Sequence, residues 1–80
     1  RMNEKRKLLY EKILEILREK PYSIRQLHKI LLKERSLEIK NPMFLSGYLK
    51  AMEDLNLPIG HTESGGAIFY YFKHKGTENE

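Results

Sequence analysis

The chain has 80 residues and no cysteine, so it holds one domain that folds by packing alone, without disulfides or thiolate metal sites. With 40% hydrophobic and 32% charged residues it has enough apolar side chains for a core, but no apolar run that could span a membrane. Its first residues lack the apolar block of a signal peptide. We therefore expect a cytoplasmic protein with a single domain over residues 1–75 and a flexible tail over 76–80.

The net charge of +4 is unevenly distributed. Residues 1–40 carry twelve basic and six acidic side chains, whereas residues 41–80 carry three basic and five acidic ones. This asymmetry fits either a polyanionic partner or a solvated helix surface, and the charge alone does not decide between them.

Residues 3–20 show the spacing of an amphipathic helix. Apolar side chains recur every three or four positions, at Leu9, Ile13, Ile16 and Leu17. Three more apolar residues widen this stripe beyond what one core needs: Leu8, Tyr10 and Leu14. The wide stripe favours a homodimer.

Pro21 ends the first helix, and a short extended segment follows at residues 22–24. A second helix then runs from Ile24 to about Lys33. Ser23 and Gln26 have the spacing of a capping box, in which each side chain binds the other residue's backbone N–H. The predicted buried face consists of Ile24, Leu27, Ile30 and Leu31. Residues 34–40 are interpreted as an extended connection.

A third helix is predicted to run from Pro42 to about Leu55, because asparagine favours the N-cap and proline the first helical position. Its expected inward stripe is Leu45, Leu49, Met52 and Leu55, flanked by Phe44 and Tyr48. Its expected outward residues are Met43, Ser46, Gly47, Lys50 and Asp54. The outward face is the first candidate for a functional surface.

Two β-type segments, residues 59–62 and 67–72, are predicted to form a hairpin across residues 63–66. In the second strand Ile68, Tyr70 and Phe72 point to one face, and Phe69 and Tyr71 point to the other. One face should cover the helices, so the other should meet solvent or a partner.

The polar residues do not form a recognisable catalytic or metal-binding pattern. His28, His61 and His74 are too scattered for metal spacing, and no cysteine is present. Ser46 and Ser64 have no histidine and carboxylate in a triad arrangement. We therefore expect no enzyme activity, no metal and no cofactor.

The order of helix, short extended segment, helix, helix and hairpin resembles the winged helix-turn-helix superfamily from about Lys7 to Lys73. The resemblance rests on SIRQLHKIL in the second helix, LSGYLKAMEDLNLPI in the third helix and its exit, and GHTESGGAIFYYF in the hairpin. It implies an α+β, mainly helical fold: a winged helix of three helices with a C-terminal two-stranded β-hairpin wing.

What the resemblance implies about function is binding to double-stranded DNA, with the third helix in the major groove and the wing on the backbone. Base edges would be met by Asn41, Met43, Ser46, Gly47 and Lys50. The wing would contact phosphates through His61, Thr62, Ser64, Gly65 and Gly66. Flanking phosphates would be bound by Arg25, Lys29 and Lys40. Such a protein would be a transcription regulator or a chromosome- or plasmid-associated factor, located at the nucleoid.

Two other functions remain open. The third helix sets Lys50 against Glu53 and Asp54, and the wing tip carries Glu63, so these surfaces are less basic than a groove-binding surface. Winged helices also serve as protein-interaction modules, for which a weakly charged third helix and exposed aromatic side chains are suited. RNA binding is the other function that remains open.

Overall fold

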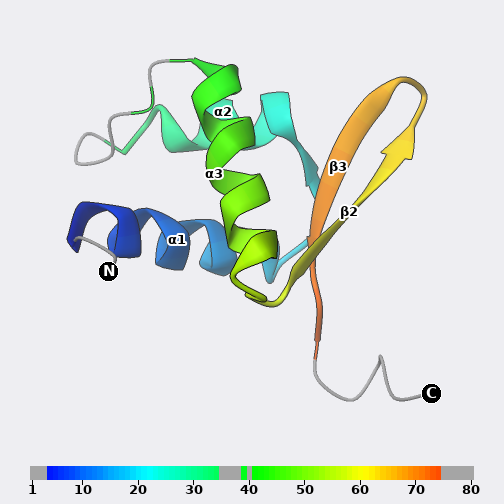
Figure 1. Ribbon diagram of the computed structural model, residues 1–80. Coiled ribbons are helices and arrows are strands. Elements are labelled where there is room, and N and C mark those ends of the chain that lie inside the picture. The colour runs from blue at the N-terminus through cyan, green and yellow to red at the C-terminus, as the bar shows by residue number, and fades with distance from the viewer. Residues whose placement is uncertain (1–3, 35–38, 40, 75–80) are drawn as a thin grey trace.

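The structure is a computed structural model that describes residues 4–34, 39 and 41–74, and the expected tail at 76–80 lies outside this range. The described part has an α+β fold with three helices and a three-stranded antiparallel sheet (Figure 1). In chain order the elements are α1 (Glu4–Leu17), β1 (Tyr22–Ser23), α2 (Ile24–Leu31), α3 (Pro42–Asp54), β2 (Ile59–Ser64) and β3 (Ala67–Phe72). None of the described helices combines the length and the apolar character needed to cross a membrane.

Helix α1 buries more of its apolar stripe than the sequence suggested. Its buried residues are Leu9, Tyr10, Ile13 and Leu17. Tyr10 is only 3% exposed and Leu14 packs against the core, so of the three residues expected to widen the stripe only Leu8, at 55%, is exposed. Of the three residues whose exposure would favour a homodimer, only Leu8 is therefore available for contact with a second copy.

Helix α2 begins with the predicted capping box. The backbone N–H of Ser23 donates to Oε1 of Gln26 at 3.0 Å, and the N–H of Gln26 donates to Oγ of Ser23 at 3.2 Å. These two bonds satisfy donors that the first turn of a helix leaves without partners. Leu27 and Leu31 are fully buried on the inner side, whereas the predicted Ile24 and Ile30 are half-buried.

Helix α3 begins at Pro42, behind an asparagine cap, as predicted. Oδ1 of Asn41 accepts hydrogen bonds from the N–H groups of Met43 at 2.9 Å and Phe44 at 3.2 Å. One side of the helix fills the centre of the core, with residues that have 0% exposure: Leu45, Leu49 and Met52. This buried side fixes which residues of α3 can face outward.

The prediction that Leu55 belongs to the inward stripe of α3 is wrong, because Leu55 is 53% exposed. The helix ends one residue earlier, and Asn56 adopts a left-handed conformation with φ 63°. The N–H groups of Asn56 and Leu57 then donate to the carbonyls of Glu53 and Met52, which is a Schellman-type helix end. The turn directs Leu55 to solvent and brings Leu57 against the core.

The sheet has three strands in the order β1–β3–β2, rather than the two strands expected for the wing. The short segment β1 pairs with the outer edge of β3, where Tyr22 lies opposite Tyr70 and Ser23 opposite Phe69. The sequence predicted residues 22–24 to be extended, but a segment this short has no pattern that could show which strand it pairs with. The pairing satisfies backbone groups that the edge of β3 would otherwise expose.

The hairpin turn is tighter than expected. Residues 63–66 were predicted to separate the strands, but β2 continues to Ser64, which pairs with Ala67. Only Gly65 and Gly66 form the turn, with φ values of 58° and 82°. A two-residue hairpin turn with positive φ at both positions suits glycine and matches the twist of the strands, so both strands can continue up to it.

The two faces of β3 differ as predicted. Tyr70 is 5% exposed and Phe72 packs against the core, whereas Tyr71 points to the opposite face. Ile68, predicted on the same face as Tyr70, is 36% exposed and is not covered by the helices. Tyr71 covers Gly60 of β2, which lies directly across from it. A Cβ atom on Gly60 would lie 2.7 Å from Oη of Tyr71, so this glycine makes room for the aromatic ring.

Candidate nucleic-acid interface

The outward face of α3 carries the residues that the sequence assigned to base edges. By helical spacing Met43, Ser46, Gly47 and Lys50 follow one another along one side of the helix. Met43 is 77% exposed, Gly47 and Lys50 are exposed, and Ser46 is half-buried. Asn41 precedes them at the N-cap, where its side-chain oxygen is already bound to the helix backbone. Its side-chain amide group can still donate to a ligand.

Basic side chains of α2 lie next to the start of α3. Arg25 and Lys29 are exposed and four positions apart, hence on the same side of α2. An open hollow of about 260 Å³ joins them to α3, and it is lined by Arg25, Gln26, His28, Lys29 and Pro42. Among the described residues, Nε2 of His28 is buried without a hydrogen-bond partner. Lys40, which the sequence placed with this group, lies outside the described residues.

All five wing residues assigned to phosphate contacts are exposed: His61, Thr62, Ser64, Gly65 and Gly66. A Cβ atom on Gly65 or Gly66 would meet nothing within 4 Å, so the tip of the hairpin is open around its backbone. Glu63, the second-last residue of β2, is also exposed. The tip therefore offers accessible backbone but an acidic side chain instead of a basic one.

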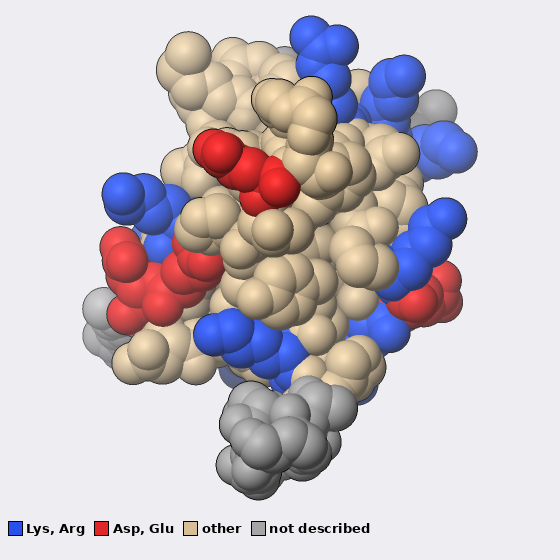
Figure 2. All heavy atoms as spheres, turned by 90° about the vertical axis from the view of Figure 1, so that its right-hand side faces the viewer, with Lys and Arg blue, Asp and Glu red and all other residues tan. Residues whose placement is uncertain are grey.

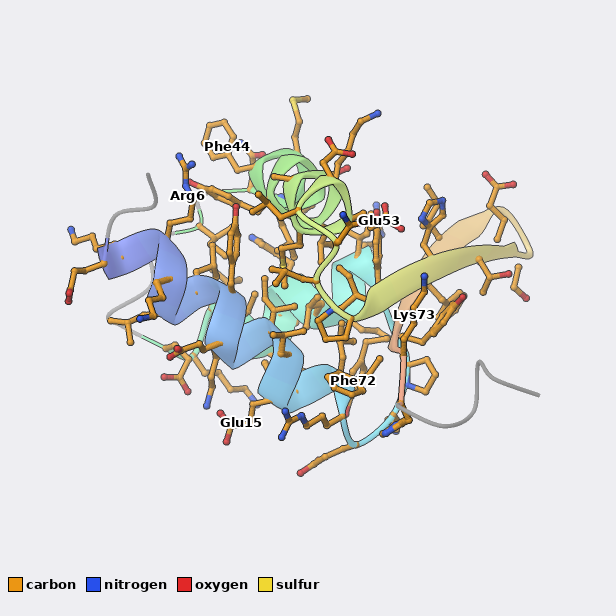
Figure 3. All side chains as sticks on the ribbon, turned by 60° about the horizontal axis from the view of Figure 1, so that its bottom comes forward. Arg6, Glu15, Phe44, Glu53, Phe72 and Lys73 are labelled. Atoms are coloured by element: carbon orange, nitrogen blue, oxygen red, sulfur yellow. The ribbon has the colours of Figure 1, made fainter. Side chains whose placement is uncertain are left out.

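His61 connects the wing to α3, a contact that sequence reasoning missed. Its Nδ1 atom lies 2.7 Å from Oε2 of Glu53, near the end of α3. Figure 3 shows Glu53 in the space between α3 and the hairpin. The contact links β2 to the last turn of α3. It also gives Glu53, one of the two acidic residues of α3, a partner. A turn separates the two residues in sequence, so no periodic pattern could have revealed the contact.

Tyr70 lies beneath this pair. The rings of His61 and Tyr70 are 5.3 Å apart at an angle of 45°. Burial raises the pKa of Tyr70 above its ordinary value of 10.0, and the nearby Glu53 carboxylate raises it further. The Tyr70 hydroxyl is therefore neutral throughout the physiological range, and the wing rests on an uncharged aromatic side chain.

Charge is sparse on the side of the molecule formed by the hairpin. Figure 2 shows mainly uncharged atoms there, with lysine and arginine side chains toward the upper right, on the left and below the centre, and acidic side chains above the centre, on the left and at the right edge. Asp54 and Glu63 are exposed, whereas Glu53 is engaged with His61. The described basic groups that other elements bring near α3 are Arg25 and Lys29 of α2 and Arg6 of α1.

A second surface was missed by sequence reasoning, which assigned Phe44 to the flank of the buried stripe. Phe44 is 49% exposed, beside an open hollow of about 330 Å³ between α1 and α3. The lining residues are Arg6, Tyr10, Met43, Phe44, Gly47, Tyr48 and Ala51. The guanidinium of Arg6 lies 6.0 Å from the centre of the Tyr48 ring, and Figure 3 shows Arg6 beside Phe44. This hollow is mainly apolar and has one basic side chain at its edge.

Within residues 4–34, 39 and 41–74, no three histidine, aspartate or glutamate side chains come together as metal ligands. Comparisons of the chain with protein-family models, with curated proteins and with solved structures found no match.

Proposed function

We propose that the chain is a winged helix-turn-helix protein that binds double-stranded DNA, with α3 in the major groove and the β2–β3 hairpin on the backbone. The order α1–β1–α2–α3–β2–β3 and the position of the hairpin next to α3 support this proposal. Regulation of transcription, or organisation of a chromosome or plasmid, is the role that such binding would serve.

The observation that carries the proposal is the outward face of α3, which exposes Met43, Gly47 and Lys50 and has Arg25 and Lys29 of α2 beside its start. The helix has 13 residues, and at about 1.5 Å per residue it is roughly 20 Å long. A major groove about 12 Å wide admits such a helix. The buried stripe through Leu49 leaves Met43, Gly47 and Lys50 on the side that would enter the groove.

The individual groups have the chemistry that duplex binding requires. Lys50 can donate to a phosphate or to a guanine edge, and the Arg25 guanidinium can bind a phosphate through two parallel hydrogen bonds. The backbone N–H groups of Gly65 and Gly66 can approach a phosphate closely because no side chain intervenes. The contact with His61 keeps the Glu53 carboxylate from facing the groove without a partner.

Replacing Lys50 or Arg25 with alanine should weaken binding to a mixed-sequence duplex. Each change removes about one phosphate contact, so the slope of log affinity against log salt should become shallower by about 0.9. Lys33→Ala is the matched control, because Lys33 is an exposed lysine just beyond the far end of α2. Titrations at several salt concentrations measure the slopes. Equal slopes for the wild type, K50A and R25A would rule out this surface.

The second candidate function is a protein-interaction module, and one observation favours it. The first turn of α3 exposes two large apolar side chains, Met43 at 77% and Phe44 at 49%, beside the hollow between α1 and α3. Exposed aromatic and methionine side chains are typical of the centres of protein interfaces. This function requires no DNA affinity, so a chain that binds no duplex at low salt would favour it over the first.

A further inference from the structure

The sheet has one edge that the described chain leaves open. Strand β1 covers the outer edge of β3, so β2 is the edge strand on the other side. Residues 61–64 of β2 are all exposed, and Figure 1 shows the hairpin extending away from the helices toward its turn. The exposed edge of a strand can pair with a strand of another chain.

The pairing of β2 with β3 fixes which backbone groups of β2 point to the open edge. Ser64 and Ala67 close the two-residue turn, a position at which two opposite residues exchange hydrogen bonds. At the other end of the hairpin, the N–H of Lys73 donates to the Pro58 carbonyl at 2.8 Å. The register between these two pairs is continuous, so the even-numbered positions of β2 bond to β3 and the odd-numbered ones point away from it.

The backbone N–H and C=O groups of His61 and Glu63 therefore point outward from the sheet. Among the described residues, no hydrogen bond from another segment reaches these groups. The outward N–H of Ile59, by contrast, is already used, because it donates to the Leu57 carbonyl at 2.7 Å. The open edge thus offers the donors and acceptors of two alternate residues to a neighbouring strand.

The side chains of these two residues favour a second copy of β2 as that neighbour. In an antiparallel pair centred on Thr62, His61 of each copy lies opposite Glu63 of the other, and the outward backbone groups of the two copies bond to each other. The histidine can donate a hydrogen bond to the carboxylate, and such complementary cross-strand pairs are stabilising. A register centred on Glu63 would instead place two carboxylates opposite each other, so the side chains favour the register centred on Thr62.

The face of the sheet away from the helices adds an apolar contact to the same register. Thr62 lies across from Phe69 of β3, which is half-buried on that face. In the paired strands two Thr62 side chains would meet at the two-fold axis, with a Phe69 ring on either side. Threonine pairs and contacts between aromatic and β-branched residues stabilise antiparallel sheets.

We propose that β2 is a self-association edge, through which two copies of the chain pair their β2 strands antiparallel about a two-fold axis at Thr62. The two three-stranded sheets then form one continuous sheet. The contact is small, so the dimer should be weak, with a Kd between about 1 μM and 1 mM. The pairing does not rest on the proposed function. It engages His61 and Thr62, which that function assigns to phosphates, so strand pairing and these phosphate contacts exclude each other.

Sedimentation equilibrium of the full chain without DNA, from about 10 μM to 1 mM, measures the association. Over this range, hydrogen exchange of the His61 and Glu63 backbone amides should slow as the dimer forms, whereas the Thr62 amide, which bonds to β3, should change less. Glu63→Lys places a cation opposite His61 at two symmetric positions, so it should weaken association about tenfold. Glu11→Lys is the matched control, because it makes the same change of net charge at an exposed residue of α1.

A chain that stays monomeric up to about 1 mM would overturn the proposal and leave the edge to an extended segment of a different protein. Equal weakening by E63K and E11K, or a dimer in which the His61 and Glu63 amides exchange as in the monomer, would overturn the strand pairing. Should E63K disturb the hairpin, Glu63→Pro decides, because it removes only an outward N–H and should likewise weaken association. Dimerisation through β2 without duplex binding would leave the pairing standing and reject the proposed function.

Discussion

Replacing Leu49 with alanine should lower the free energy of unfolding by about 2–5 kcal/mol. Leu49 is 0% exposed, in the middle of the stripe by which α3 packs against α1 and α2. The substitution removes buried apolar contacts and leaves a cavity that a well-packed core fills only in part. Since a small domain has a total stability of only about 5–15 kcal/mol, this one change should remove a large share of it.

Leu55→Ala is the matched control for this prediction. It makes the same chemical change six positions later, but at a residue that is 53% exposed beyond the end of the helix. Its cost should stay below about 1 kcal/mol. Urea denaturation followed by circular dichroism measures both variants. Similar losses from L49A and L55A would mean that α3 does not end and turn as described here.

A charge series at Gly47 should change duplex affinity strongly while leaving the fold intact. Gly47 lies on the outward face of α3, and a Cβ atom there would meet nothing within 4 Å. Gly47→Ala should therefore stabilise the helix by about 0.5–1 kcal/mol. Gly47→Glu adds a negative charge that would face the phosphates, and we expect it to weaken duplex binding by more than about tenfold.

Gly47→Ala and Gly47→Lys are the comparisons that separate charge from shape. Alanine introduces a side chain without charge, and we expect its affinity to stay within about threefold of the wild type. Lysine should strengthen binding and steepen the salt dependence by about one phosphate. Fluorescence anisotropy measures all three variants on the same duplex. If glutamate and lysine give the same affinity as alanine, the outward face of α3 does not contact DNA.

Sequence reasoning was most successful where local chemistry sets the structure. The capping box at Ser23 and Gln26, the Asn41 cap and the burial of Leu45, Leu49 and Met52 in α3 are confirmed. Each depends on residues within one or two helical turns, so the sequence pattern contains the whole interaction. The glycine pair at 65–66 was also recognised as a turn, although not its two-residue length.

What the sequence could not predict depends on contacts between distant segments. Pairing of β1 with β3 joins residues nearly fifty positions apart, and the contact of His61 with Glu53 crosses a turn. The exposure of Leu55 follows from the left-handed conformation of Asn56, which apolar periodicity does not encode. For the same reason sequence reasoning named individual residues of the candidate site but missed the hollow between α1 and α3 beside it.

Duplex binding is tested most directly by the salt dependence of wild-type affinity. A labelled mixed-sequence duplex is titrated with the protein at about 50 and 200 mM salt, and binding is followed by fluorescence anisotropy. A protein that neutralises about four phosphates should lose on the order of a hundredfold in affinity over that range. Finding this loss would support duplex binding and justify a search for a specific site. No binding at the lower salt concentration would contradict it and favour the protein-interaction module.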